Sequence, residues 1–482
     1  MSSTLLLSLV VLYFLILLVV AHYTSRNSNN ESFFIGNKSS NWMLVAFGMI
    51  GTSLSGVTFV SVPGTVGSAA FGYFQVVIGN LLGYFLIAGI LLPLYYRLNL
   101  TSIYNYLLQR FGFTSYKTGA IFFILSRTLG ATARLYLVIN VLQIFILDNM
   151  GISFGTTSFV ILLMILLYTF RGGVKTIVWT DTLQTTFMLL GLVACVVYIT
   201  SHFDWSFGQT MQTLSAKGFT RIFNTDFNSA GFFLKQILGG AFITIAMTGL
   251  DQEMMQKNIS VRTLKDSQKN MITFSMIMVV VNFLFLLLGG LLYLFAEQNG
   301  ISVAPDDLFP TVALQYLPEY ISIIFIIGLI SALFPSADGA ITALTSSFCI
   351  DILGLKRKEN LSEASKVRIR QTVHLSFALI FFLCILIFKW VDDKSIINTI
   401  LILAGYTYGP LLGLFAFGIL TKRRMNESLV PAVCLIAPAL CYFLNKFAAS
   451  RPDGFQIGIE LMIWNGAITF LGLLLISKRQ RS

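Results

Sequence analysis

Runs of apolar residues, each about 20 residues long and almost free of charge, follow one another along the whole chain. A helix needs about that length to cross the hydrocarbon core of a bilayer, which is about 30 Å thick. The runs do not alternate apolar with polar residues, as the strands of a β-barrel would. We therefore predict about thirteen membrane-spanning helices, over residues 4–22, 42–62, 70–96, 118–147, 153–170, 178–201, 229–251, 271–296, 321–350, 371–390, 396–420, 427–446 and 456–477.

The composition agrees with this pattern. The chain has 482 residues, of which 56% are hydrophobic and 11% charged, and its mean hydropathy is +0.80. Soluble domains carry about 25% charged residues, so we predict an all-α polytopic membrane protein, built as one domain over residues 1–482. The lipid bilayer is its expected surroundings. The net charge of +11 is attributed to cytoplasmic loops rather than to nucleic-acid binding. The five cysteines lie in or beside apolar runs, which argues against a disulfide scaffold.

The distribution of basic residues predicts the orientation in the membrane. Of the 32 Lys and Arg residues, 23 fall in the loops after the odd-numbered spans and at the C-terminal end, 6 fall in the opposite loops, and 3 fall inside spans. Cytoplasmic loops carry the excess of Lys and Arg. We therefore expect the N-terminus outside and the C-terminus in the cytoplasm.

Two of the apolar spans are interrupted by glycines and hydroxyl residues. The second span contains two glycines and four hydroxyls within residues 51–58, and the seventh has the same character over residues 239–252. Lipid tolerates an unwound helix only around a cavity, where free carbonyl groups bind cations. The two interruptions lie five spans apart, as an inverted repeat of five plus five helices requires. Close packing of small residues is the alternative explanation.

The ninth span carries a carboxylate in the middle of the membrane. Asp338 lies beside a stripe that includes Ala332 and Pro335, with Ser336 on the other side of the stripe. Pro335 frees the carbonyl of Ser331 from its helical hydrogen bond. Carbonyl, hydroxyl and carboxylate oxygens together suit a hard monovalent cation. The alternative is that Asp338 pairs with a basic side chain for structural reasons.

Other charged residues near the spans allow two interpretations each. Asp181 opens the sixth span and is either an N-cap or a functional carboxylate. Arg127 and Arg134 share one face of the fourth span and either pair with acids or bind a substrate carboxylate. A dense group of glycine and proline over residues 405–410 predicts a bend in the eleventh span.

Motifs in a fixed order make the chain resemble a known family over about residues 5–477. They are Ser53-Leu54-Ser55-Gly56-Val57-Thr58-Phe59, Arg171-Gly172-Gly173-Val174-Lys175 with Trp179-Thr180-Asp181, Gly249-Leu250-Asp251-Gln252, and Ser336-Ala337-Asp338 with Ser346, Ser347 and Asp351. The chain is similar to the sodium:solute symporters, which include bacterial sialic acid, galactose and proline symporters and human sodium/glucose cotransporters. The resemblance implies inverted five-helix repeats of the LeuT type over residues 42–201 and 229–420. One extra helix at 4–22 precedes them, and two more at 427–477 follow.

The resemblance also implies a sodium site between the second and ninth spans. Its ligands would be the carbonyls of Gly51, Leu54 and Ala332 and two consecutive hydroxyls. The first hydroxyl position is Pro335 here, so that only Ser336 remains and coordination shifts towards Asp338. In sialic acid symporters a second sodium lies near the residue matching Asp181.

Substrate contacts transfer less completely. The resemblance places them at Ser53, Ser55, Thr58, Gln75 or Asn80, Thr244, Met247 and within residues 401–408, where Tyr406 is the candidate. Arg134 is added from its position on the fourth span, as a group that could bind a substrate carboxylate. The arginine that binds the sialic acid carboxylate aligns with Gly130, and the glutamine that contacts galactose aligns with Leu401. Neither signature is therefore intact.

We expect a symporter that uses sodium entry to import a small polar organic solute, such as a sugar, sugar acid or other carboxylate, by alternating access. Proton coupling through Asp338 is the alternative. The chain lacks the repeated filter of a channel, and its three histidines lack a partner at metal-binding spacing, so neither a channel nor an enzyme is expected. Sodium and the solute are the expected ligands, in a bacterial inner membrane, with no obligatory protein partner.

Overall fold

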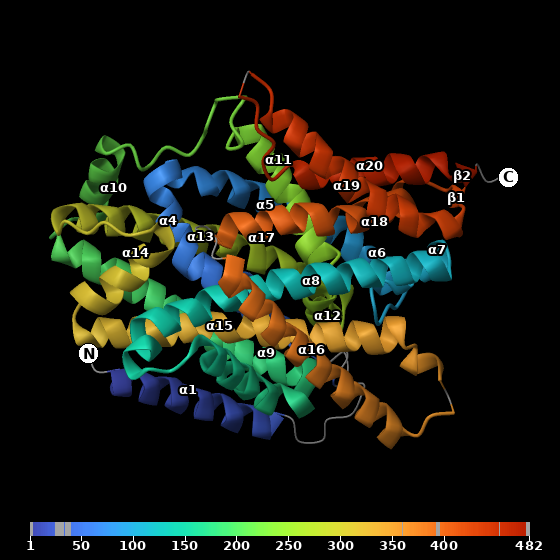
Figure 1. The fold of residues 1–482 in the computed structure, drawn as a ribbon, viewed down its shortest axis with the longest axis horizontal. Helices are drawn as coiled ribbons and strands as arrows, with labels where there is room; N and C mark the ends of the chain where they lie inside the picture. Colours follow the sequence, from blue (N-terminus) through green and yellow to red (C-terminus); the bar gives the residue numbers. More distant parts are fainter. Residues whose placement is uncertain are drawn as a thin grey trace.

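The computed structural model describes residues 3–24, 33, 40–358, 360–391, 396–452 and 454–478. It is a bundle of helices, most of which run along the long axis of the molecule (Figure 1). The first half contains α1 (Ser3–Thr24), α3 (Trp42–Ser53), α4 (Gly56–Ala69), α5 (Phe74–Leu86), α6 (Leu92–Arg97), α7 (Asn105–Arg110), α8 (Phe113–Leu142), α9 (Phe154–His202) and α10 (Phe207–Ala216).

The second half contains α11 (Phe233–Thr244), α12 (Gln252–Ile259), α13 (Leu264–Gln298), α14 (Pro305–Thr311), α15 (Glu319–Ser347), α16 (Glu363–Val391), α17 (Ile396–Thr407), α18 (Gly409–Leu420), α19 (Val430–Ala449) and α20 (Leu461–Leu475). Two short antiparallel strands, β1 (Arg424–Met425) and β2 (Ser477–Lys478), join the chain beyond α18 to its C-terminal end. The prediction of an all-α polytopic membrane protein is confirmed.

Eight helices of the described chain are long and apolar enough to cross a membrane, or up to ten if each strongly bent pair is one span. Three shorter apolar helices accompany them: Trp42–Ser53, Phe154–Phe170 and Leu461–Leu475. The number of about thirteen membrane spans stays a prediction. The two spans predicted at 153–170 and 178–201 fall within α9, which is helical throughout. Its two segments meet one aromatic cluster: Tyr168 contacts Phe334 of α15, and Phe187 contacts Tyr13 of α1, whose ring stacks on Phe334.

The core is built around α15. This helix packs against α9, α8, α3 and α4, and its residues from Gly328 to Ser347 are all buried. A helix that is apolar on every side is stable only in such surroundings. The polar residues of α15 that lie within this stretch, Asp338 among them, therefore face other helices rather than lipid.

Both predicted interruptions are present. The helix of the second span ends at Ser53, and α4 starts at Gly56, because Leu54 (φ −82°, ψ 81°) and Ser55 (φ −77°, ψ 174°) leave the helical conformation. In the seventh span, α11 passes through a π-helical turn over residues 245–249 and breaks before α12, with a bend of 65°. A third bend of 43° separates α17 from α18, where the 405–410 segment predicts one.

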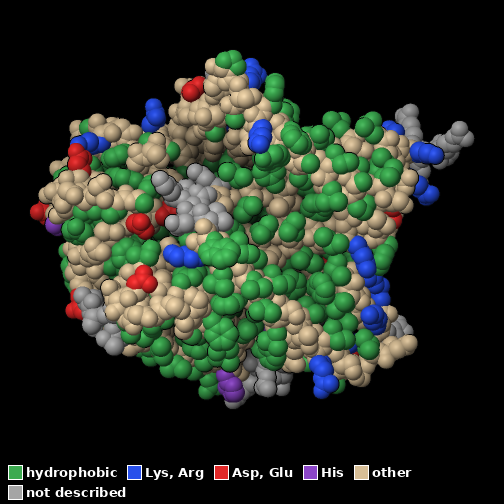
Figure 2. Space-filling model, viewed as in Figure 1, with side chains coloured by type: hydrophobic (Ala, Val, Ile, Leu, Met, Phe, Trp, Pro, Cys, Tyr) green, Lys and Arg blue, Asp and Glu red, His purple; other side chains and the backbone are tan. Residues whose placement is uncertain are grey.

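The surface separates charge along the long axis. Figure 2 shows Lys and Arg gathered at the edge that carries α7, β1 and β2, whereas most of the visible acidic side chains lie at the opposite edge. α1 begins near that opposite edge (Figure 1). One residue counted with the basic loops is misplaced: Lys257 lies in α12 and is buried. The side chains of Arg171 to Gly173 and of Lys175 lie outside the described residues.

Candidate functional site at the broken helices

A polar cavity of about 130 Å³ lies between the two broken helices. We name it the central cavity; its polar lining residues are Thr52, Ser53, Ser55, Thr58, Asn80, Arg127, Arg134, Thr244 and Thr248, and its apolar ones include Val76, Met247, Met254 and Leu401. Seven of the nine residues predicted for substrate contact line this cavity. The structure places the other two elsewhere. The Tyr406 hydroxyl accepts a hydrogen bond from Asn445 at 3.4 Å, and Gln75 lines a neighbouring cavity.

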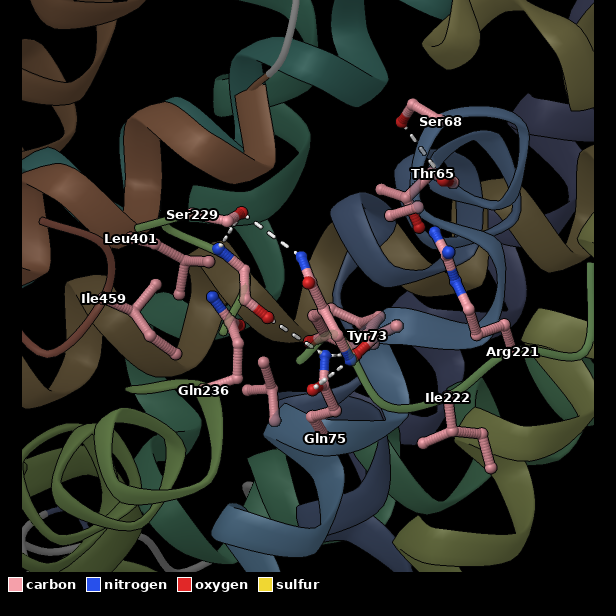
Figure 3. A pocket seen from close by; sticks show the side chains of 15 residues that line it. Thr65, Ser68, Tyr73, Gln75, Arg221, Ile222, Ser229, Gln236, Leu401 and Ile459 are labelled. Carbon is pink, nitrogen blue, oxygen red and sulfur yellow. Dashed lines mark hydrogen bonds between the residues drawn. The ribbon is translucent and has the colours of Figure 1, made fainter. Parts of the chain in front are cut away.

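That neighbouring cavity, the vestibule, has a volume of about 320 Å³. It is lined by Thr65, Ser68, Gln75, Arg221, Gln236 and Ile459 among others, and Figure 3 shows these side chains around it. The vestibule shares Tyr73, Val76 and Leu401 with the central cavity. The two cavities are therefore adjacent, with these three side chains between them.

Two groups in the central cavity suit recognition of a polar solute. The Asn80 amide and the Thr244 hydroxyl, on α5 and α11, are hydrogen-bonded at 2.9 Å. Arg134 of α8 is half-buried, and no ion pair of the described residues involves it. A guanidinium in a cleft that forms no ion pair with a carboxylate is a ready partner for an anionic group.

Arg127, which also borders the cavity, is already paired. Its guanidinium contacts the Glu253 carboxylate and lies 3.9 Å from Asp251. Asp251 caps the N-terminus of α12 by accepting from the amides of Glu253 and Met254, and it also accepts from the Tyr408 hydroxyl at 2.9 Å. Of the two interpretations of Arg127, pairing with acids is therefore the one that the structure supports. Arg127 neutralises the carboxylates at the second broken helix.

A second buried ion pair joins three helices. Lys257 of α12 donates to Asp181 of α9 at 2.6 Å and to the Thr52 hydroxyl of α3 at 2.5 Å. Thr52 in turn donates to Asp181 at 3.1 Å, and Glu253 lies 3.7 Å from the same ammonium. Lys257, Asp181 and Thr52 are each at most 2% exposed. Asp181 is therefore not an N-cap, because its carboxylate lies within α9 and holds a lysine.

Asp338 takes no part in an ion pair among the described residues. Its carboxylate accepts from the Tyr168 hydroxyl at 2.8 Å and from the amide of Gly339. The alternative that Asp338 pairs with a basic side chain such as Arg127 or Arg134 is wrong, because no ion pair of the described residues joins Asp338 to a Lys or Arg, and Arg127 binds Glu253 instead. A side chain at Gly339 would overlap the Glu253 carboxylate. The Glu253 carboxylate thus lies directly against α15 at that glycine.

Oxygen atoms without partners gather at the first break. No backbone hydrogen bond among the described residues ends on the carbonyl of Gly51 or Leu54. The carbonyl of Ala332 lies 4.0 Å from where a Cβ of Gly56 would be, so α15 faces the break at that level. Ser336 is buried, and its hydroxyl donates to the Leu333 carbonyl at 3.0 Å. Free carbonyls at an unwound helix are the groups that bind sodium in such transporters.

Sequence reasoning missed Glu253, Lys257 and Tyr168. Glu253 and Lys257 stand four residues apart, a spacing that places two side chains on one helix face. That spacing was a usable signal, but the polar segment Gln252–Ile259 has the composition of a loop. Tyr168 gives no signal, because its contact with Asp338 depends on the tertiary packing of α9 against α15.

Two discontinuous helices that face a polar cavity inside an apolar bundle define a secondary transporter. The family model of the sodium:solute symporters matches residues 33–429. The chain belongs to this family, whose members couple transport of a solute to sodium.

Relatives with known activity are similar over most of the chain. A sodium/sialic acid symporter of Aliivibrio fischeri is 24% identical over 424 residues, which are 85% of this chain and 81% of the relative. The mouse sodium-coupled monocarboxylate transporter 1 is 26% identical over 81% of this chain and 64% of its own length.

Among solved structures, the substrate-bound outward-open state of a sodium-coupled sialic acid symporter superposes with a TM-score of 0.84 at 20% identity. The match covers 98% of this chain and 99% of that one. The inward-facing conformation of Mhp1 gives a TM-score of 0.51 at 13% identity. These likenesses confirm the LeuT-type fold.

Proposed function

We propose that this sodium-coupled symporter imports a small organic anion, with Arg134 as the group that binds its negative charge. The observation that carries the proposal is the contrast between the two arginines of the central cavity. Arg127 is neutralised by Glu253 and Asp251, whereas Arg134 has no such partner among the ion pairs of the described residues. Relatives that transport sialic acid and monocarboxylates support the same chemical class.

Hydroxyl and amide groups complete the recognition. Ser53, Ser55 and Thr58 at the first break, together with the Asn80–Thr244 pair, offer donors and acceptors for the polar remainder of the solute. The cavity is small, about 130 Å³. A carboxylate of a few carbon atoms or the polar half of a sugar acid fits such a volume better than a disaccharide.

Sodium binds, in this proposal, between α3 and α15. The carbonyls of Gly51, Leu54 and Ala332 and the hydroxyl of Ser336 are its ligands. Asp338 adds negative charge at the same level of α15, in compensation for the hydroxyl that Pro335 lacks. The N-terminus lies outside and the C-terminus in the cytoplasm of a cell membrane, in accordance with the bias of basic residues. The vestibule then opens towards the outside.

The experiment is uptake into proteoliposomes with an inward sodium gradient, for a panel of lactate, pyruvate, N-acetylneuraminate, galactose and proline. We expect accumulation of at least one of the three organic anions and none of galactose. Arg134→Gln should abolish it, whereas Arg134→Lys, which keeps the charge, should retain part of it. Accumulation of galactose or proline alone, or full activity of Arg134→Gln, would refute the assignment of an organic anion.

A further inference from the structure

A third cavity lies at the end of the bundle that carries β1 and β2. It has a volume of about 540 Å³ and lies between α6, α7 and the end of α18, and Figure 1 shows α6 and α7 at that end. We name it the interfacial cavity. The residues that line it differ from those of the central cavity and of the vestibule. It therefore lies apart from the proposed route of the solute.

One wall of the interfacial cavity is apolar and belongs to a membrane span. Between α5 and α6 the helix makes a π-helical turn over Ile87–Leu91. Gly89, in this turn, lies beside open space, because a Cβ there would meet nothing within 4 Å. Ile90 and Leu94 also line this wall, and Ile90 is 49% exposed. The candidate span Gly56–Arg97 contains all of these residues, so the apolar wall faces lipid.

The other wall carries three basic side chains. Arg97 is the last residue of that candidate span, Arg110 ends α7, and Lys422 follows α18. Arg97 and Lys422 are exposed. None of the ion pairs of the described residues involves these three side chains, and none of the described lining residues is acidic. The cavity therefore carries positive charge that no carboxylate of its lining balances, at the level where a membrane span ends.

Arg110 gives the basic wall a fixed shape. Its Nε donates to the carbonyl of Gly418 at 3.2 Å, and its Nη2 donates to the carbonyls of Thr421 at 2.7 Å and Arg423 at 3.1 Å. These bonds tie the chain on both sides of Lys422 to α7. Arg110 is thus a structural residue of the wall, and a wall that is formed in advance lowers the cost of binding a ligand.

Cations beside an apolar, lipid-facing wall complement a lipid that bears a phosphate. Basic pockets between transmembrane helices near the cytoplasmic surface bind the anionic head groups of lipids. A soluble anion would contact the basic wall and leave the apolar wall uncovered. We infer that the interfacial cavity binds an anionic phospholipid, with its phosphate at Arg97 and Lys422 and an acyl chain along Ile90 and Leu94.

Lipid binding to the purified, delipidated protein tests this inference. The probes are phosphatidylglycerol, phosphatidylcholine with the same acyl chains, and glycerol 3-phosphate as the soluble head group, and native mass spectrometry measures the lipid that stays bound. We expect phosphatidylglycerol to bind more tightly than phosphatidylcholine, and an excess of glycerol 3-phosphate to leave it bound. Equal binding of the two lipids, or displacement by glycerol 3-phosphate, would overturn the assignment to an anionic phospholipid.

Two double variants with the same change in net charge locate the site. Arg97→Gln with Lys422→Gln should weaken phosphatidylglycerol binding about 30-fold, because each basic residue near an anionic lipid contributes about 5-fold. Arg424→Gln with Lys478→Gln is the matched control, since these exposed residues pair across β1 and β2 at the same edge and do not line the cavity. Equal losses in both double variants, or no loss in the first, would show that the lipid does not bind in this cavity.

Thermal unfolding in detergent gives a second readout, because a ligand that binds only the folded protein stabilises it. Phosphatidylglycerol should raise the melting temperature of the wild type and of the control double variant, and that of Arg97→Gln with Lys422→Gln much less. A similar increase in all three proteins would contradict the inference. Neither measurement needs the solute or sodium, so a failure here leaves the proposed function standing, and a failure of the proposed function leaves the lipid site standing.

Discussion

The Ser336 hydroxyl is the side-chain oxygen that α15 offers at the level of the first break. It is buried, and in the structure it donates to the carbonyl of Leu333. A hydroxyl used in this way keeps its lone pairs available to a cation. If it is a sodium ligand, its loss weakens sodium binding without removing a contact to the solute.

We expect Ser336→Ala to raise the sodium concentration needed for half-maximal uptake roughly 5- to 150-fold, which corresponds to about 1–3 kcal/mol for one lost neutral ligand. The apparent affinity for the solute at saturating sodium should change less. Ser322→Ala is the control, because that hydroxyl is also buried and donates to a backbone carbonyl, but near the start of α15. An unchanged sodium dependence of Ser336→Ala would show that Ser336 is not a ligand.

Asp338 is a buried carboxylate whose hydrogen bonds come from neutral donors, Tyr168 and the amide of Gly339. Asn in its place keeps the shape and an acceptor for the Tyr168 hydroxyl, but it loses the charge and the second acceptor, which the Gly339 amide uses. We expect Asp338→Asn to fold and to insert into the membrane, but to lose sodium-driven accumulation. Uptake is measured with a sodium gradient and, separately, with a proton gradient in potassium buffer. Normal sodium-driven accumulation by Asp338→Asn would remove Asp338 from the coupling mechanism, and equal uptake in potassium buffer would favour protons.

At the level of helices, glycines set how closely α5 and α11 approach each other. α5 and α11 cross where Gly79 meets the backbone of Ile237 and Gly240 meets the backbone of Val76. A Cβ at Gly79 would overlap the Ile237 carbonyl, which is backbone and cannot rotate away. This crossing also positions Asn80 and Thr244 in the central cavity.

Gly79→Ala should therefore destabilise the folded protein by about 1–3 kcal/mol, as overpacking does, and it should lower uptake by displacing Asn80. Gly89→Ala is the matched control, because a Cβ there meets nothing within 4 Å. Thermal unfolding in detergent, followed by the fluorescence of the native tryptophans, measures the stability of both variants. Equal melting temperatures for the two variants would contradict the role assigned to the crossing.

The sequence predicts the interruption of each broken helix but not how far the second one extends. Glycines and hydroxyls at mid-span have few other uses in lipid, so the breaks at Leu54–Ser55 and before α12 could be foreseen. The segment Gln252–Ile259 could not, because its polar residues read as a loop. In the fold they satisfy one another and their neighbours: Glu253 binds Arg127, Lys257 binds Asp181, and Gln252 accepts from the amide of Ile103. Such pairing is a tertiary property that local composition does not encode.

For the whole molecule, the long axis of Figure 1 is the expected membrane normal, with the vestibule on one side and the basic edge on the other. Asn228, in the segment 219–233 that borders the vestibule, and Lys422, beyond α18, then lie on opposite sides of the membrane. Replacing each by cysteine tests this orientation in a background without the native cysteines. We expect a membrane-impermeant maleimide to label Asn228→Cys on intact cells and Lys422→Cys only after permeabilisation. The reverse pattern would invert the orientation.

The Lys257 ammonium lies between Asp181, Thr52 and Glu253. This is the neighbourhood for which the resemblance to sialic acid symporters predicts a second sodium ion, and we expect the ammonium to take its place. A tethered charge stays with the protein, so it contributes nothing to the charge moved per transport cycle. One sodium ion entering with one monovalent anion then moves no net charge, and the accumulation ratio is independent of membrane potential. A second sodium ion would add about 2.3 kcal/mol per 100 mV, roughly a 50-fold higher ratio. We therefore expect a potassium diffusion potential imposed with valinomycin to leave the final accumulation of the anion unchanged, so that the cell's sodium gradient alone limits how far the solute is concentrated.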